Sequence, residues 1–266
     1  MKKIGIALFV FLLFITLIPL MVLLFCSFLP LDSANDLLAG KRIPLVFSIS
    51  QFMDLFEDSF YSRMLLQSVK LTFFAVLFHL PVSFFAGLMI WQAGRRMKMI
   101  ATAAYVVALL LPFQSTMLPV YQIFHALHLE DSLWSIIALA VFAPLGPLVM
   151  ATWLEMLPEH CLDAALLETN SMVKINFYIL LPQLLPVLIV LGFVTAAEAW
   201  NMTEQPLILL QQMNARPLSA VYNNTQRGGD SIAYAGSLLY LLPCLLMVIV
   251  LILIGKQKKV LLSCRE

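Results

Sequence analysis

Six long stretches of this chain contain no Asp, Glu, Lys or Arg, and they restrict its fold more than any other feature. A helix needs about 20 consecutive apolar residues to cross the hydrocarbon layer of a membrane, and each stretch is longer than that. They are also too long and too continuously apolar for the alternating strands of a membrane barrel. We therefore predict an all-α polytopic membrane protein. The stretches run from Ile4 to Leu31, Leu71 to Gly94, Met99 to Leu129, Ser132 to Leu154, Ile175 to Ala197 and Ser231 to Gly255.

The composition agrees with lipid as the solvent. Of 266 residues, 62% are hydrophobic and 12% are charged, against about 25% charged residues in a soluble domain. The net charge of +1 provides no basic field to attract nucleic acid, so we expect no nucleic-acid partner. We predict one transmembrane domain over 1–266, with a cytoplasmic stretch at about 156–175 between the fourth and fifth helices. The six helices are expected at about 5–29, 65–91, 100–125, 133–155, 179–204 and 231–255.

The distribution of cations predicts the orientation of the chain. Lys and Arg in short loops beside helix ends stay on the cytoplasmic side, and a six-helix count places ten cations on one side and five on the other. Both termini are then cytoplasmic. The ten are Lys2, Lys3, Arg95, Arg96, Lys98, Lys174, Lys256, Lys258, Lys259 and Arg265, and the five are Lys41, Arg42, Arg63, Arg216 and Arg227.

Prolines interrupt two of the predicted spans. Pro112 and Pro119 lie in the third, and Pro144 and Pro147 lie in the fourth. An interior proline removes a helix hydrogen bond and is tolerated in lipid where neighbouring helices or a cavity satisfy the backbone. Each proline taken singly favours an ordinary packing kink, whereas four in adjacent spans also fit a moving or cavity-lining pair.

The stretch after the fourth span predicts a short cytoplasmic helix. Pro158 suits a first helical turn, Glu159 and Asp163 place negative charge near its positive N-terminal end, and two alanines keep it slim. The residues at helical spacing form a small, weakly apolar face that suits the groove of another protein. A helix lying on lipid headgroups is the alternative, although such helices usually carry bulky apolar residues and several cations. The face comprises Cys161, Ala164, Ala165 and Glu168.

Polar residues inside the spans are candidates for a translocation path, because ionisable groups are costly there. Glu198, Asn201 and Glu204 follow Thr195 at steps of three residues and could line the path or meet the partner permease, and Gln114 lies deep in the third span. Two simpler roles account for these residues about as well as a place on the path does. Asn201 would cap a helix end, and Glu204 would lie at the level of the lipid headgroups. A lone polar group such as Gln114 or His79 more often bonds a neighbouring helix than a ligand.

Several segments resemble the permease subunits of binding-protein-dependent ABC importers. The stretch 157–171, continuing to Ile179-Leu-Leu-Pro182, is similar to their cytoplasmic signature, which reads E-A-A, three residues, G, then about nine residues to I-x-L-P. Segments 111–121 and 127–134 look like the third span and the following loop of the carbohydrate branch. Ala199-Trp-Asn201 and Pro206-Leu207 resemble that branch's W-N-D-F-x-x-P-L segment. The closest comparison is the C-terminal-type permease subunit of maltose-like importers.

The chain departs from this pattern at four positions. Asp163 replaces the family's Glu, Thr169 its Gly, Asn170 its Ala, and Met202 the Asp of the carbohydrate branch. Thr is β-branched and tolerates poorly the positive φ or close backbone approach that Gly permits. Either this loop turns differently or it meets an ATPase of altered surface.

The resemblance implies the partners and the energy source. The chain would work with two copies of an ABC ATPase, a second permease, an extracytoplasmic solute-binding protein and membrane lipid, in the bacterial inner or plasma membrane. It has no G-x-x-x-x-G-K-[ST] loop to bind phosphates, so we expect no cofactor of its own, with ATP and Mg on the ATPase. A sugar, oligosaccharide or related solute is the implied cargo. The implied coupling residues are Asp163, Ala164, Ala165, Glu168 and Thr169.

Three alternatives are considered. A secondary transporter with two three-helix repeats would show related halves, and the first half has no counterpart to 157–182. An intramembrane hydrolase would need a G-x-S-x-G or H-E-x-x-H motif, which the sequence lacks, and the four histidines show no metal-ligand spacing, so we predict no metal site. An ABC complex of the same architecture with a non-sugar cargo, such as a polyol or glycerol phosphate, stays open.

Overall fold

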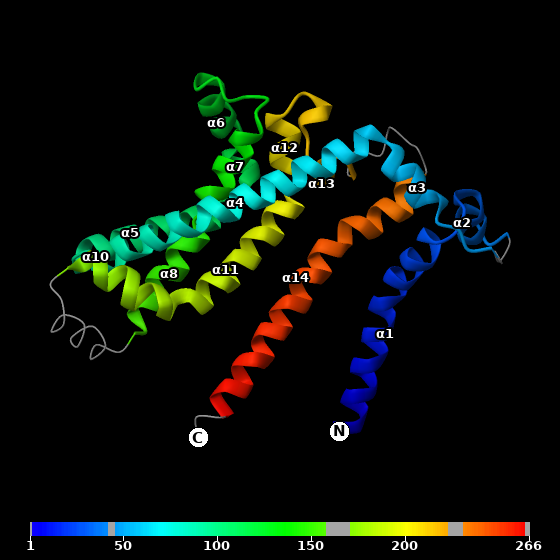
Figure 1. Cartoon of the computed structure of the whole chain (residues 1–266). Helices are drawn as coiled ribbons and strands as arrows, with labels where there is room; N and C mark the ends of the chain where they lie inside the picture. Colours follow the sequence, from blue (N-terminus) through cyan, green and yellow to red (C-terminus); the bar gives the residue numbers. More distant parts are fainter. Residues whose placement is uncertain (1, 42–45, 158–170, 223–230, 264–266) are drawn as a thin grey trace. The chain divides into compact units, whose positions relative to one another are not determined.

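The computed structural model describes residues 2–41, 46–157, 171–222 and 231–263, and over these ranges the chain is helical and contains no strand. It divides into two compact units (Figure 1): Met1–Arg63 with Asn224–Glu266, and Met64–Asn223. The predicted all-α class is confirmed for the described residues.

Four helical segments are long and apolar enough to cross a membrane. They are Leu8–Ser27 of α1 (Lys2–Ser27), α4 (Ser59–Gln92), Leu133–Glu155 and Met172–Asn201. A fifth span results if the bent pair Arg95–Leu110 and Phe113–Ala126 is counted as one. The last helix, α14 (Ser231–Ser263), has a shorter apolar stretch at Tyr234–Val250. A polytopic membrane protein is therefore confirmed, whereas six spans and cytoplasmic termini stay predictions.

The stretch predicted as one span at 100–125 consists of two helices. α5 (Arg95–Leu110) and α6 (Phe113–Ala126) meet at an angle of 103°. Pro112 lacks an N–H and disfavours a helical conformation at the residue before it, and Leu111 is accordingly extended with ψ 119°. Pro112 therefore accounts for the break.

The fourth stretch is also interrupted, at Pro144. α7 (Leu133–Val141) ends three residues before this proline, and α8 (Leu145–Glu155) begins directly after it. Because the helix does not continue through 142–144, the carbonyl of Val141 needs a partner from outside its own helix.

Two hydrophobic clusters hold the unit Met64–Asn223 together, and both include residues of α4. One contains Leu71 and Ala75 of α4 with Ile136 and Ala140 of α7. The other contains Phe84 and Leu88 of α4, packed with residues of α8, of the π-helix η1 (Ile175–Leu180) and of α11 (Leu181–Asn201). The stretch of α4 between the two clusters carries polar side chains, which are described below.

Small residues allow α4 and α8 to approach closely. A Cβ on Gly87 of α4 would lie 2.4 Å from the Cβ of Met150, and a Cβ on Gly146 of α8 would lie 2.0 Å from Ser83 Oγ. Ser83 and Gly87 are four residues apart on one face of α4, the small-xxx-small spacing that brings membrane helices together. The packing of these helices therefore depends on the absence of larger side chains.

The unit Met1–Arg63 with Asn224–Glu266 is built on α1 and α14, which contact each other and run in opposite directions (Figure 1). The connection after α1 forms two short helices, α2 (Leu31–Leu38) and α3 (Ser50–Glu57). Gln51 of α3 is buried, and its Nε2 donates to the carbonyls of Cys26 at 3.0 Å and Leu29 at 2.6 Å. Gln51 thus provides a donor to the Leu29 carbonyl just beyond α1 and a second donor to the Cys26 carbonyl, which also accepts from the backbone N–H of Leu29.

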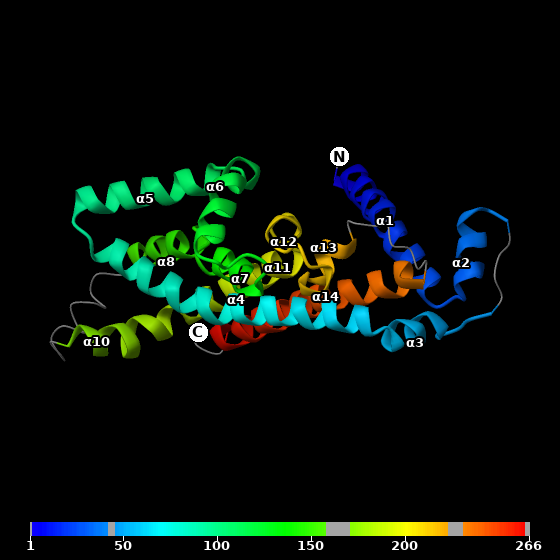
Figure 2. The ribbon, with the colours of Figure 1, turned by 90° about the horizontal axis from the view of Figure 1, so that it is seen from above.

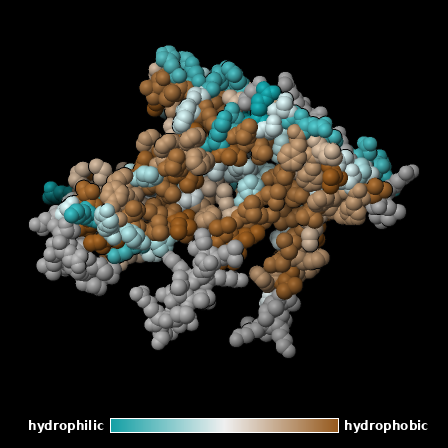
Figure 3. Space-filling model, viewed as in Figure 1, coloured by the Kyte–Doolittle hydropathy of each residue, from teal (hydrophilic) through white to brown (hydrophobic). Residues whose placement is uncertain are grey.

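Hydrophobic residues cover much of the visible sides of the helices in Figure 3, and hydrophilic residues gather around α6 and around α12 (Glu204–Leu209). Many of the exposed side chains are large and apolar, including Phe9, Phe73, Leu110 and Phe142. Such a surface matches a lipid environment or contact with partner subunits.

Candidate transport and coupling sites

Gln114 and Glu204 form a polar pair between two helices. Gln114 is the second residue of α6 and Glu204 the first of α12, and Gln114 Nε2 donates to Glu204 Oε2 at 2.7 Å. Both side chains are exposed. Their remaining donors and acceptors can bind a polar solute such as one with several hydroxyl groups.

Asp131 fixes the chain that follows α12. Its backbone N–H donates to the carbonyl of Leu209 at 3.0 Å, and its carboxylate accepts from the backbone N–H groups of Gln211 and Gln212. Asp131 has φ +58°, a left-handed conformation that Asp tolerates better than most residues. The loop between α6 and α7 thereby holds one end of α12, while Gln114 contacts the other.

Two serines hold the segment around α12 and α13 (Leu218–Tyr222) to the rest of this unit. Ser68 Oγ of α4 accepts from the backbone N–H of Leu218 at 2.8 Å. Ser219 Oγ donates to the carbonyl of Met202 at 2.6 Å. The segment that carries the W-N and P-L resemblance is therefore tied to α4 and to the end of α11.

The other predicted path residues differ in their surroundings. Thr195 is buried within the chain, with 4% of its surface exposed. Glu198 is exposed on α11, and Asn201 is the last residue of that helix, with Nδ2 donating to the carbonyl of Ala197 at 2.8 Å. Glu198, Asn201 and the pair of Gln114 with Glu204 thus present polar groups at the surface of this chain, whereas Thr195 does not.

His79 is the buried polar residue of α4 between the two hydrophobic clusters. Its Nδ1 lies 2.9 Å from the carbonyl of Val141, and its Nε2 lies 3.2 Å from Ser83 Oγ. Because a carbonyl can only accept, Nδ1 carries a proton, and in that tautomer Nε2 accepts from the serine hydroxyl. His79 therefore satisfies the carbonyl that the break at Pro144 leaves free, and it bonds a neighbouring helix as expected of a lone polar group.

The predicted coupling residues lie outside the described residues. This applies to Asp163, Ala164, Ala165, Glu168 and Thr169, which fall within 158–170. The described flanks are α8, which ends at Glu155, and α10 (Met172–Lys174), which continues into η1 and α11. The wider turn of η1 ends two residues before Pro182, whose ring nitrogen cannot donate the helix hydrogen bond to residue 178.

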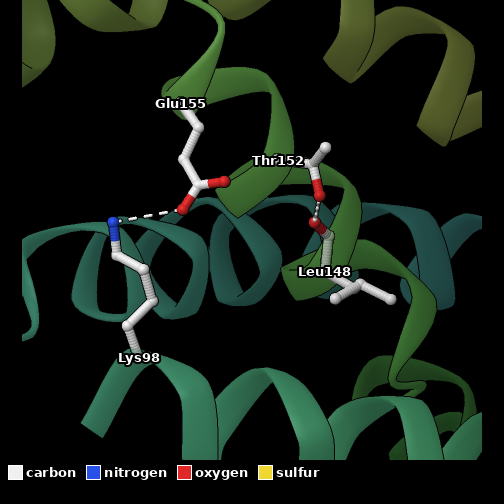
Figure 4. Close-up of polar contacts among 4 residues, drawn as sticks. All are labelled: Lys98, Leu148, Thr152 and Glu155. Atoms are coloured by element: carbon white, nitrogen blue, oxygen red, sulfur yellow. Dashed lines mark hydrogen bonds and ion pairs between the residues drawn. The ribbon is translucent and has the colours of Figure 1, made fainter. Parts of the chain in front are cut away.

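An ion pair joins α5 to the end of α8, and the two helices lie side by side (Figures 1 and 2). Lys98 Nζ lies 3.1 Å from Glu155 Oε1. In Figure 4 the two side chains point toward each other, whereas the Thr152 hydroxyl turns back along α8 and donates to the carbonyl of Leu148 at 2.8 Å.

Sequence reasoning missed two of these pairings. It treats Lys98 only as a marker of topology, and for Glu204 it leaves open a place on the translocation path or at the headgroup level, without a partner. The one signal available was the position of isolated charges beside apolar stretches, and that signal gives no partner for a residue distant in the sequence. From the sequence, Asp131 is only an acidic residue of a loop. The structure shows that its carboxylate accepts hydrogen bonds from residues 211 and 212.

The chain is similar to several known permease proteins. No protein-family model matches it. The arabinooligosaccharides transport system permease protein AraQ of Halalkalibacterium halodurans is 26% identical over 250 residues, covering 91% of this chain and 88% of AraQ. The probable starch degradation products transport system permease protein AmyC of Thermoanaerobacterium thermosulfurigenes is 27% identical over 177 residues, covering 65% of each chain.

A solved structure shares the fold. It belongs to a bacterial ABC transporter involved in the import of the acidic polysaccharide alginate, with a TM-score of 0.80 and 16% identity over 94% of this chain and 95% of that one. The resemblance inferred from the sequence is thereby confirmed: this chain is similar to sugar-transport permease proteins over most of its length, and it shares the fold of an ABC importer structure.

Proposed function

We propose that this permease carries a sugar, oligosaccharide or closely related solute. The observation that supports it most is the similarity to AraQ over nine-tenths of the chain. AmyC and the alginate importer point to the same class of cargo. The exposed pair of Gln114 with Glu204 supplies amide and carboxylate groups of the kind that hydrogen-bond hydroxyl groups.

Transport by this chain depends on partner subunits. A second permease completes the translocation path, a solute-binding protein delivers the cargo, and two copies of an ABC ATPase hydrolyse ATP. The segment Asp163–Thr169 docks in a cleft of the ATPase, with Ala164 and Ala165 packed against it and Asp163 and Glu168 making polar contacts. Support for this arrangement comes from the sequence signature and from the small residues of the segment.

Co-purification and uptake test the assembly. The tagged chain, expressed with its candidate partners, is expected to bring down an ATPase and a second permease in fixed ratio and to support ATP-dependent uptake in proteoliposomes. Ala165→Arg places a long cation in the predicted contact and should abolish uptake. Ala126→Arg is the matched control, because Ala126 is exposed at the end of α6. Full uptake by Ala165→Arg would contradict the docking.

A ligand panel tests the cargo. The candidate solute-binding protein is heated with sugars, oligosaccharides, polyols and glycerol phosphate, because a bound ligand raises apparent stability by mass action. Stabilisation by an oligosaccharide supports the proposal, and stabilisation by a non-carbohydrate alone would overturn it. Gln114→Leu is then expected to raise the KM for uptake of the stabilising ligand, with Gln122→Leu, an exposed glutamine on the same helix, as the control.

A further inference from the structure

The ion pair between Lys98 and Glu155 lies where the predicted coupling segment begins. Glu155 is the last residue of α8, and two residues separate it from the range 158–170. Lys98 belongs to the first turn of α5, so its bond to Glu155 at 3.1 Å attaches the end of α8 to a second helix.

Neither charge is favoured by its own helix. Lys98 lies near the positive N-terminal end of α5, whose first turn contains no acidic residue. Glu155 lies at the negative C-terminal end of α8, whose last turn contains no basic residue. The helix dipole favours an acidic residue at the N-terminal end and a basic residue at the C-terminal end. Each side chain therefore gains from the other an attraction that its own helix does not provide.

The ion pair between Lys98 and Glu155 is expected to add little to the folding stability of the chain. The Lys98 side chain is 31% exposed and the Glu155 side chain 51% exposed, and exposed ion pairs contribute little to folding. The geometry still specifies one partner for each group, as Figure 4 shows. An ion pair that contributes little to the free energy of folding can still fix the relative position of two helix ends.

The helix on the other side of the pair leads to the candidate path. α5 ends at the break before Pro112, and α6 begins there with Phe113 and Gln114. A displacement of the end of α8 is passed through the pair to α5, and α5 is connected by two residues to the helix that holds Gln114 against Glu204.

We propose that Lys98 and Glu155 are positioning residues that link the coupling segment to α5 and α6, so that ATP hydrolysis on the partner moves the helix carrying Gln114. This inference rests on the proposed function. It assigns to the pair a role in the ratio of solute transported to ATP hydrolysed, rather than in assembly or folding.

Charge reversal in the reconstituted complex tests the link. Lys98→Glu and Glu155→Lys should each lower the ratio of uptake to ATP hydrolysis by about fivefold or more, the lower end of typical coupling between sites. The double reversal restores the attraction and should recover the ratio to within about twofold of wild type, the size of change that context alone produces. Arg96→Glu, an equal charge change on an exposed residue of the same turn, should leave the ratio unchanged.

Neutral variants distinguish a loss of coupling from a failure of the complex to assemble. Lys98→Gln and Glu155→Gln remove the pair without placing like charges together, and uptake is normalised to the complex recovered. Single variants that couple as wild type does, or a double reversal no better than the single ones, would overturn the inference while the proposed function stands. A wild-type complex without ATP-dependent uptake would refute the proposed function and this inference with it.

Discussion

Replacing Gly146 by alanine should destabilise the unit Met64–Asn223. An added Cβ would lie 2.0 Å from Ser83 Oγ and 2.5 Å from His79 Nε2, distances at which heavy atoms repel strongly. Ser83 and His79 are both buried on α4, with exposed fractions of 0% and 2%, so neither side chain can turn into solvent. The added methyl group must push α4 and α8 apart or displace His79.

The expected loss follows from two costs and one smaller gain. Overpacking a well-packed site costs about 1–3 kcal/mol, and displacing His79 leaves the Val141 carbonyl without its donor, which costs about 1–3 kcal/mol more. The higher helix propensity of alanine returns about 0.5–1 kcal/mol. We therefore expect a net destabilisation of about 1–5 kcal/mol.

Thermal unfolding of the purified chain in detergent measures this loss, with Gly192→Ala as the matched control. A Cβ on Gly192 of α11 would meet its nearest atom, Leu80 Cδ1, at the ordinary contact distance of 3.4 Å. Gly192→Ala should keep or raise the Tm, and Gly146→Ala should lower it. Adding Ser83→Ala should recover part of the loss. Equal Tm values for the two alanine variants would refute the close approach of α4 and α8.

Three further changes test other polar contacts by the same unfolding measurement. His79→Ala should cost about 1–3 kcal/mol, because the Val141 carbonyl loses its donor, and a Tm equal to wild type would show that this carbonyl finds another partner. Gln51→Ala should cost about 1–3 kcal/mol by removing the donor to the buried Leu29 carbonyl, while Gln67→Ala, a glutamine of intermediate exposure on α4, should change the Tm less. Asp131→Ala should lower the Tm more than Asp131→Asn, because Asn keeps an acceptor and tolerates the φ of +58°; the reverse order would contradict the loop geometry.

Local patterns in the sequence predict the parts of this fold that depend on near neighbours. Uncharged apolar stretches predict the helices, and the prolines predict interruptions near Pro112 and Pro144. The angle at Pro112 is not predictable in this way, because a proline removes a bond without selecting the direction in which the next helix continues. That direction depends on packing against α7, the next helix along the chain, and against α12, which is distant in the sequence.

The contacts of the candidate site depend on distant residues. Gln114 and Glu204 are 90 residues apart, and Lys98 and Glu155 belong to different helices. No periodicity within one helix selects such partners, because a side chain's polarity shows that it needs a partner and leaves open which one. His79 illustrates the limit: the sequence predicts a bond to a neighbouring helix, and the structure identifies the Val141 carbonyl.

Met202 shows how a departure from the carbohydrate-branch pattern changes the chemistry of the site. Where that branch has Asp, this Met is half-buried against the cluster that includes Leu209 and Ala199. A carboxylate in this position would meet mostly apolar neighbours and would lose hydration that they cannot replace. Two residues further on, Glu204 is exposed and accepts the hydrogen bond from Gln114. The exposed carboxylate of this segment is therefore that of Glu204, which is bonded to Gln114, and position 202 supplies none.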